Sequence, residues 1–330
     1  MHRLAALSLL FCATIATYAQ TASSENTDAV VRRYIQWRGG AAFQALRSIH
    51  LSGNVMDGGL AGTKQVWLTR QGVYWERRQT GSITTVIAVQ GDNKWRTNLS
   101  GQPIQLSENE AMHYERDAAV LFAGIFAGEL AASVEGRPDE IFEGSSYNVF
   151  RVSFGDADTY DFLVTPKTGE LRAIRTTVDR HSQLIVYAQW QPIAGVEQPF
   201  VKETRSSNQA SQSSFSAQSI LANEPLESAL FQEPQNPIHL IFSDKSDWSG
   251  WIKFEFVDGK RIFVPAQVNG RNALLLLDSG AETTVLGRDV ALGAGINCTG
   301  QIGVEGPEDR TPQRSAQASR SSLAKLQCQA

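Results

Sequence analysis

From about residue 50 to about residue 235, apolar and polar residues alternate in short segments, which predicts a β-rich chain. These segments are rich in Val, Ile, Thr, Tyr and Trp, and Gly, Asp and Asn separate them. Such a pattern is typical of antiparallel strands joined by tight turns. The predicted strands span residues 64–70, 73–79, 83–90, 94–98, 147–154, 160–164, 171–178 and 184–191.

Apolar residues at helical spacing interrupt this alternation in two places. The triplet Asn26-Thr27-Asp28 can cap a helix, and apolar residues follow it on one side until Gly39-Gly40. A second helical stretch is predicted over residues 109–132. The fold class indicated is mainly β with helices, as one strongly curved antiparallel sheet that carries helices against one face.

From Trp251 onward the pattern is that of strands alone. Asp258-Gly259 and Asn269-Gly270 are hairpin signals between alternating segments. The apolar run 274–277 then ends abruptly at Asp278. A short apolar run bounded by turn residues predicts a strand buried on both faces. A carboxylate at the mouth of such a strand is a candidate reactive group, because apolar surroundings shift its pKa.

Length and charge narrow the possible functions. The chain has 330 residues, which is enough for two domains. Its 30 basic and 34 acidic side chains give a formal net charge of -4, which argues against a nucleic-acid surface. The cysteines Cys12, Cys298 and Cys328 and the five histidines are scattered without metal-ligand spacing, so neither a metal nor another cofactor is predicted.

Residues 1–19 have the pattern of a secretory signal peptide. Arg3 precedes an apolar core over residues 4–16, and Thr17-Tyr18-Ala19 places small residues where a signal peptidase cuts. The alternative is an N-terminal membrane anchor. The expected location is exported, either periplasmic or secreted.

Several turn-level phrases resemble the periplasmic carrier and receptor of outer-membrane lipoproteins, the LolA/LolB-like family. The phrases are Arg38-Gly39-Gly40 and the residues up to Leu46, Gly91-Asp92-Asn93-Lys94-Trp95, Pro166-Lys167-Thr168-Gly169, and Asn223-Glu224-Pro225-Leu226 with Phe231 and Pro234. The resemblance implies a LolA/LolB-like half-barrel over residues 25–235, whose apolar concavity would hold acyl chains of a lipid or lipoprotein ligand. The alternative is that the same side chains only fill an ordinary core.

The segment Asp278-Ser279-Gly280-Ala281-Glu282, followed by Thr284-Val285-Leu286, resembles the active loop of retropepsin-like aspartic proteases. The resemblance implies that Asp278 is catalytic, that Ser279 and Gly280 support the loop, and that Ala281 and Glu282 line the substrate cleft. Gly303, in the glycine-rich stretch 300–306, would then contact substrate from a flap. The alternatives are a strand-end turn whose Asp caps backbone N–H groups, and an ordinary glycine loop.

Aspartic proteolysis needs two carboxylates that share a proton, and this chain offers one motif, so a homodimer is implied. The first hypothesis is therefore an exported aspartic endopeptidase that cleaves a peptide or protein substrate. Residues 236–250 would be a linker, 251–306 a partial retropepsin-like domain, and 307–330 a disordered tail, so weak activity is expected. The alternative is a periplasmic lipid- or lipoprotein-binding protein with a non-functional protease remnant.

Cys298 and Cys328 are the cysteines that remain after the predicted signal peptide. They could pair in an oxidising compartment. Because Cys328 lies in the tail predicted to be disordered, the sequence favours two free thiols.

Overall fold

The protein is described from a computed structural model. The structure describes residues 26–81, 83–99, 101–155, 158–178, 181–206, 212–234, 250–278, 284, 286–302 and 325–329. The predicted signal peptide and most of the predicted linker and tail lie outside these ranges.

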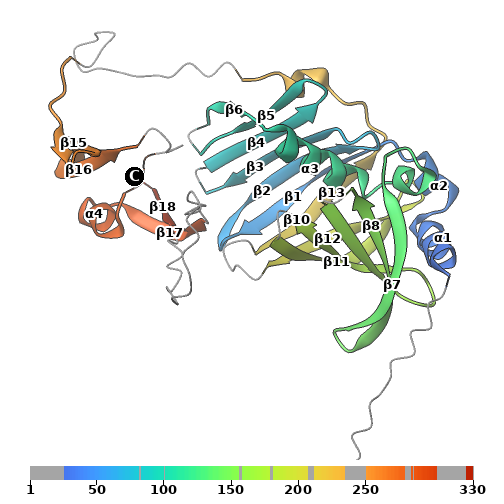
Figure 1. Ribbon diagram of the computed structural model, residues 1–330. Coiled ribbons are helices and arrows are strands. Elements are labelled where there is room, and N and C mark those ends of the chain that lie inside the picture. The colour runs from blue at the N-terminus through green and yellow to red at the C-terminus, as the bar shows by residue number, and fades with distance from the viewer. Residues whose placement is uncertain are drawn as a thin grey trace, which may run out of the picture.

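One antiparallel sheet of thirteen strands dominates the fold (Figure 1). Its order is β6-β5-β4-β3-β2-β1-β13-β12-β11-β10-β9-β8-β7, so two meanders meet where β1 pairs with β13. The edge strands β6 and β7 do not pair, and the curved sheet stays open, which confirms the predicted fold class. The strands are β1 (Ser48–Asp57), β2 (Leu60–Thr69), β3 (Tyr74–Thr80), β4 (Ile83–Gln90), β5 (Asn93–Thr97), β6 (Pro103–Gln105), β7 (Ser133–Phe142), β8 (Ser145–Phe154), β9 (Asp158–Val164), β10 (Leu171–Val178), β11 (His181–Ile193), β12 (Val196–Ser206) and β13 (Ser213–Ala222).

The inner face of this sheet carries the main apolar core, because alternate side chains of each strand point to one face. Phe150, Phe162 and Ile174 are buried there, while their neighbours Val149, Leu163 and Ala173 form a smaller cluster on the outer face. Four short helical segments cover the inner face: α1 (Thr27–Arg38), α2 (Ala41–Ala45), α3 (Glu108–Ala119) and the 3₁₀ helix η1 (Ala123–Ala127). We call these four segments the helical cover.

Local signals fix where the helices begin and end. The side chain of Asn26 accepts a hydrogen bond from the N–H of Asp28, as the sequence predicts. Ser107 and Glu110 form a capping box at the start of α3. The predicted helix over residues 109–132 is too long. It breaks after Ala119, and η1 ends at Gly128, whose φ of 75° stops a helix.

The outer face of β2 to β5 is covered by the segment that follows β13. The 3₁₀ helix η3 (Ser228–Phe231) packs Phe231 against Trp75 and Trp95. The indole N–H of Trp95 donates a 2.8 Å hydrogen bond to the backbone oxygen of Phe231. The sheet therefore buries apolar side chains on both faces in this half.

A second, three-stranded sheet follows, built from β14 (Glu255–Val257), β15 (Arg261–Val268) and β16 (Arg271–Leu277). The turns at Asp258-Gly259 and Asn269-Gly270 stand where they are predicted, with positive φ at all four residues. The prediction that the run before Asp278 is buried on both faces is wrong for this structure: Leu274, Leu276 and Leu277 are half exposed or more. Among the described residues, Ala291, Ala294 and Ile296 pack against Val268 at one end of this sheet, and these three leucines of β16 stay exposed beyond them.

The remaining elements are α4 (Arg288–Gly293), β17 (Asn297–Ile302) and β18 (Lys325–Gln329). β17 and β18 pair as antiparallel strands, and the register places Cys298 opposite Cys328. Directly opposed residues in an antiparallel pair have Cα atoms roughly 4.5–5.5 Å apart, which is within the range that a disulfide spans.

From this register we predict a disulfide, where the sequence favours two free thiols. In protein recovered from an oxidising compartment, we expect Cys298 and Cys328 to be joined, because the strand pair holds them opposite each other. Counting free thiols on the unreduced, unfolded protein should give none from these two positions, and Cys298→Ser should expose one. Two reactive thiols in the unreduced parent protein would contradict this prediction.

Candidate functional site

The space between the helical cover and the inner face is filled by aromatic side chains. Tyr34, on α1, is fully buried at the centre of this cluster. Its ring lies between 5.6 and 6.0 Å, centroid to centroid, from those of Phe43, Phe126, Phe150 and Phe162, and most of these pairs meet edge to face. Such pairs add stabilisation to the burial of apolar area. These side chains belong to the largest of the apolar clusters among the described residues.

Arg70, just after β2, binds the helical cover to the sheet. Its Nη1 donates to the backbone oxygen of Gln44 in α2, and its Nε donates to Oε2 of Glu129 at 2.5 Å. Its Nη2 forms an ion pair with the other oxygen of Glu129, which follows η1. These hydrogen bonds lower the pKa of the Glu129 carboxyl. One side chain thus bridges the sheet and two separate parts of the cover.

Farther along the inner face, towards the β1–β2 turn, lies a buried charge network centred on Glu76. Its carboxylate contacts Lys64 Nζ at 2.5 Å and Arg78 Nη2 at 2.7 Å, and it accepts a hydrogen bond from the Tyr74 hydroxyl at 2.5 Å. Arg78 also pairs with Asp57. The Glu76 side chain is only 3% exposed, so its charge is compensated by these partners and not by water.

Burial and neighbouring charges shift the pKa values of this network in opposite directions. Burial alone would raise the pKa of Glu76, but the cations of Lys64 and Arg78 outweigh it and lower that pKa to about 2. Burial lowers the pKa of Lys64 to about 8, although the Glu76 carboxylate raises it in part. The inner face therefore has an aromatic half under the cover and a charged half beside it.

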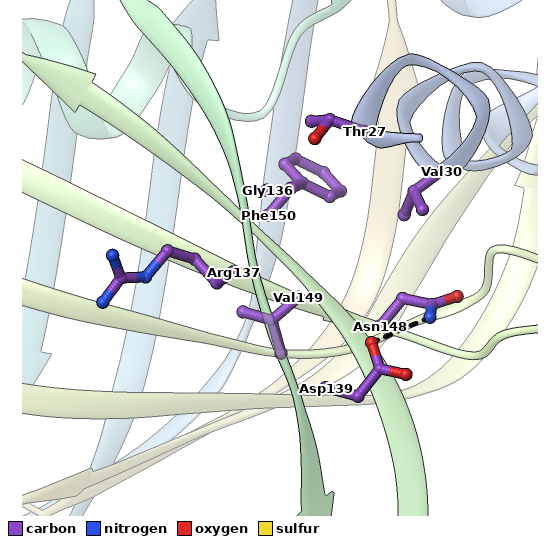
Figure 2. A pocket seen from close by; sticks show the side chains of 8 residues that line it. All are labelled: Thr27, Val30, Gly136, Arg137, Asp139, Asn148, Val149 and Phe150. Carbon is purple, nitrogen blue, oxygen red and sulfur yellow. Dashed lines mark hydrogen bonds between the residues drawn. The ribbon is translucent and has the colours of Figure 1, made fainter. Parts of the chain in front are cut away.

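Two hollows among the described residues are characterised by their linings, and neither is an apolar pocket for a chain-like ligand. The first lies between the start of α1 and strands β7 and β8, beside the hydrogen bond from Asn148 to Asp139 (Figure 2). Its volume of about 20 Å³ suits a single water molecule. The second, about 480 Å³, opens on the surface and is lined mostly by polar residues and glycines of the β1–β2 and β12–β13 ends.

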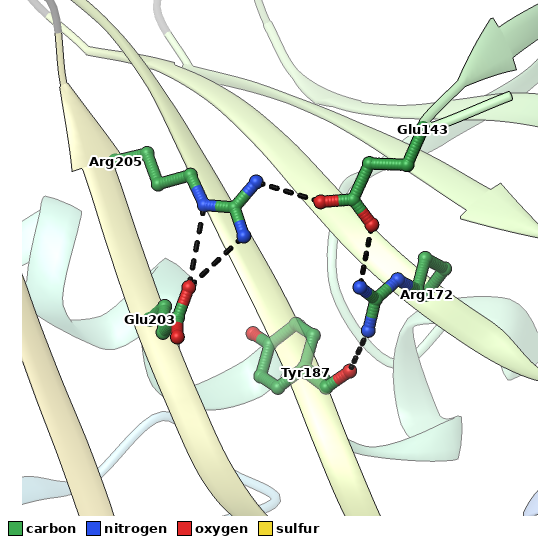
Figure 3. A network of polar contacts seen from close by, with 5 residues as sticks. All are labelled: Glu143, Arg172, Tyr187, Glu203 and Arg205. Atoms are coloured by element: carbon green, nitrogen blue, oxygen red, sulfur yellow. Dashed lines mark hydrogen bonds and ion pairs between the residues drawn. The ribbon is translucent and has the colours of Figure 1, made fainter.

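An ion-pair network beside the second hollow holds the outer face together. Glu143, at the β7–β8 turn, binds Arg172 at 2.6 Å and Arg205 at 2.8 Å, and Arg205 also binds Glu203 (Figure 3). Arg172 donates a second hydrogen bond to the backbone oxygen of Tyr187. The network ties the β7–β8 hairpin across β10 to β12. Its members are partly exposed, so we regard it as a structural brace.

Of the residues predicted for a peptidase site, the structure describes only Asp278, which is exposed directly after β16. Ser279, Gly280, Ala281, Glu282 and Gly303 lie outside the described residues. The predicted site therefore stays a prediction. No group of three or more metal-ligating side chains occurs within the described ranges.

Sequence reasoning missed both Arg70 and Glu76. A signal for Glu76 exists, because Tyr74, Glu76 and Arg78 alternate along one strand and must share a face. That this face is the buried one cannot be read from the strand alone. Arg70 carries no local signal, since its partners are 26 and 59 residues away in the chain.

Comparison with known proteins yields similar structures but no similar sequences. No protein-family model matches the chain, and neither does any curated protein sequence. A LolA superfamily protein from Nitrosomonas europaea is 13% identical, with a TM-score of 0.44, over 63% of this chain and 98% of that one. A DUF1329 family protein from Desulfovibrio piger is 9% identical, with a TM-score of 0.43, over 63% and 98% of the two chains.

A putative outer membrane lipoprotein-sorting protein domain from Vibrio parahaemolyticus is 8% identical, with a TM-score of 0.41, over 62% of this chain and 97% of that one. Of the three, the Nitrosomonas europaea protein bears the name of the family that the turn-level motifs resemble. Similarity at this level concerns the course of the chain and carries nothing about function. None of these three structures is described as a protease.

The Glu76 network generates a stability prediction. Glu76→Gln leaves Lys64 without its carboxylate and Arg78 with Asp57 alone, and we expect it to lower the free energy of unfolding by about 3–5 kcal/mol. Glu143→Gln, which breaks a partly exposed network, should cost less than about 1 kcal/mol. Urea unfolding at neutral pH measures both. If the two variants lost equal amounts of unfolding free energy, Glu76 would not be the centre of a buried network.

The pH dependence of this effect follows from the pKa of Glu76. Because the folded value of about 2 lies below the ordinary value of 4.5, the stabilisation is complete above pH 4.5 and is lost as the pH falls towards 2. The parent protein should therefore lose stability over this range more steeply than Glu76→Gln. Parallel stability curves for the two proteins would contradict the assignment.

Proposed function

We propose that residues 27–231 form a binding domain for the acyl chains of a lipid or lipoprotein, and that the ligand occupies the inner face of the sheet. The observation that carries this proposal is an aromatic interior closed by a cover of short, separate helices. A ligand-bound state would replace helix-to-sheet contacts with acyl-to-sheet contacts. The apolar area buried, and hence the hydrophobic stabilisation, would then be largely retained.

The construction of the cover supports such an exchange. Both α2 and η1 have five residues, so neither has enough internal hydrogen bonds to be stable away from the sheet. Segments of this kind open at lower free energy than the strands they cover. Because aromatic side chains fill the space between the cover and the sheet, binding on the inner face requires the cover to move.

Arg70 is the point at which this movement can be controlled. Its bonds to Gln44 and Glu129 are present only while the cover is closed, so they stabilise the empty form relative to the bound one. Any interaction made only in the closed state lowers the apparent affinity for a ligand that needs the open state.

Substitution of Arg70 tests this function. We expect the parent protein to bind a palmitoylated peptide in a fluorescence assay, and Arg70→Gln to bind it several-fold more tightly. Arg172→Gln is the matched control, because it removes a partly exposed ion pair of the outer face and should leave the affinity unchanged. The proposal fails if neither the parent nor Arg70→Gln binds the probe. If Arg172→Gln increased the affinity for the peptide as much as Arg70→Gln does, the bonds of Arg70 would have no specific role in controlling the cover.

The peptidase hypothesis competes with this proposal and has a separate test. If Asp278 is catalytic in a homodimer, the parent should cleave peptides at acidic pH in a pepstatin-sensitive reaction, and Asp278→Asn should abolish cleavage without changing the melting temperature. Activity should also fall on dilution, because each site needs two copies of the chain. Equal cleavage by parent and variant would contradict a catalytic role for Asp278.

Export to the periplasm or outside the cell remains part of the proposed function and rests on residues 1–19 of the sequence. None of the helices in the described ranges combines the length and apolar content needed to cross a bilayer.

A further inference from the structure

Arg38, the last residue of α1, is a buried cation without a carboxylate partner among the described residues. Its side chain is among the largest that are fully buried, and the residue is 1% exposed. Nη1 donates a 3.0 Å hydrogen bond to the Tyr34 hydroxyl. Nε is buried as well and has no acceptor within the same ranges. A buried charge of this kind is costly unless it is paired and hydrogen-bonded.

Aromatic rings surround the Arg38 guanidinium. Its central carbon lies 4.5 Å from the centroid of the Phe43 ring, 5.6 Å from that of Trp190 and 5.9 Å from that of Tyr34. Cation–π contacts and the C-terminal end of α1 offset part of the cost of burial. Neither provides an acceptor for Nε.

A second donor in this region lacks an acceptor. The indole Nε1 of Trp190 on β11, whose ring contacts the guanidinium, is buried and has no hydrogen-bond partner among the described residues. Orphaned buried polar groups are rare and need an explanation. Arg38 Nε and Trp190 Nε1 are both donors, so the missing group is an acceptor.

Several other arginines of the described chain have carboxylate partners. Arg116 pairs with Asp158, Arg151 with Asp161, and Arg175 with Glu140, each at 2.6 Å. These three side chains are between 22 and 33% exposed and need a partner less than Arg38 does. The absence of a carboxylate at Arg38 therefore stands out within the described residues.

The position of Arg38 relates it to the proposed ligand site. The guanidinium lies between α1 and α2 of the cover on one side and β11 of the sheet on the other. The chain is tightly apposed here, because a Cβ on Gly39 would lie 2.2 Å from the backbone oxygen of Gly195. Movement of the cover away from the sheet would open this seam and expose the guanidinium to a ligand.

We infer that Arg38 binds the anionic head of an amphiphilic ligand, a long-chain carboxylate whose acyl chain lies on the inner face of the sheet. This inference rests on the acyl-binding function proposed above and specifies the ligand class. A carboxylate suits the site because an arginine presents N–H donors in a planar fork that matches two carboxylate oxygens. The unpaired Nε is one donor of that fork, and the indole Nε1 of Trp190 is a further donor from the sheet.

The test compares ligands that differ only at the head. We expect the parent protein to bind oleate about tenfold more tightly than oleyl alcohol, as a charge-assisted hydrogen bond at the head implies. Arg38→Met should lower the affinity for oleate to that for oleyl alcohol, and it should leave the affinity for oleyl alcohol unchanged. Arg32→Met, which removes an exposed arginine of the same helix, is the control. It should still bind oleate more tightly than oleyl alcohol.

A second readout separates ligand binding from a structural role. A buried, unpaired cation opposes folding, so ligand-free Arg38→Met should melt at the same temperature as the parent or higher. A cation retained for packing would give a lower melting temperature together with an unchanged head preference. If Arg38→Met does not fold, the parent protein alone still tests the inference. Equal affinities of the parent for oleate and oleyl alcohol would overturn it.

The outcomes separate this inference from the function on which it rests. Binding of oleyl alcohol and oleate with equal affinity keeps the acyl-binding function and rejects the anion site. Binding of neither rejects both. A lysophosphatidylglycerol probe distinguishes the possible anions: if it binds with a dependence on Arg38 and oleate does not, the assignment of a carboxylate head is overturned in favour of a phosphate.

Discussion

An open, curved sheet cannot bury its inner face by closing on itself, and this constraint shapes the whole domain. In a closed barrel, opposite strands cover each other's inward side chains, whereas here β6 and β7 remain as separate edges. The apolar inner face needs other elements as its cover, and α1, α2, α3 and η1 provide them. Tyr34 shows how closely the two layers fit, since its ring meets rings from the cover and from β8 and β9.

The same constraint makes the interior adaptable. A cover of short helices is stabilised mainly by the apolar surface it buries, with a few polar contacts such as those of Arg70 at its margin. An acyl chain offers the sheet an equivalent apolar surface. The outer face is different, because η3 and the β7–β8 hairpin are tied down there by Trp95 and by the Glu143 ion pairs. Exchange of the cover for a ligand is therefore expected on the inner face only.

Buried charge marks two places where the interior departs from simple packing. At Glu76 the charges compensate one another, so the network stabilises the fold within its pH range. At Arg38 the described chain supplies aromatic rings and a phenol but no anion. The first arrangement is complete without a ligand and the second is not, and for this reason we assign only Arg38 a role in binding.

The sequence by itself determined the features that depend on neighbouring residues. Period-two alternation, the Asn26 cap and the Asp258-Gly259 and Asn269-Gly270 turns are local, and the structure has them where they are expected. The helix predicted over 109–132 is too long because helical spacing continues past Ala119, whereas the chain breaks to fit Phe122 and Ile125 into the core.

Only the tertiary structure decided which strands meet and which faces are buried. The pairing of β1 with β13 joins residues between 156 (Asp57 and Ser213) and 173 (Ile49 and Ala222) positions apart, and no short pattern encodes it. Burial depends on what covers a strand, so the apolar run before Asp278 gave no warning that Leu276 would be exposed. The partners of Arg70, Glu76 and Arg38 are likewise set by packing between distant segments. A charged residue in the sequence does not reveal whether water, a carboxylate or an aromatic ring will surround it.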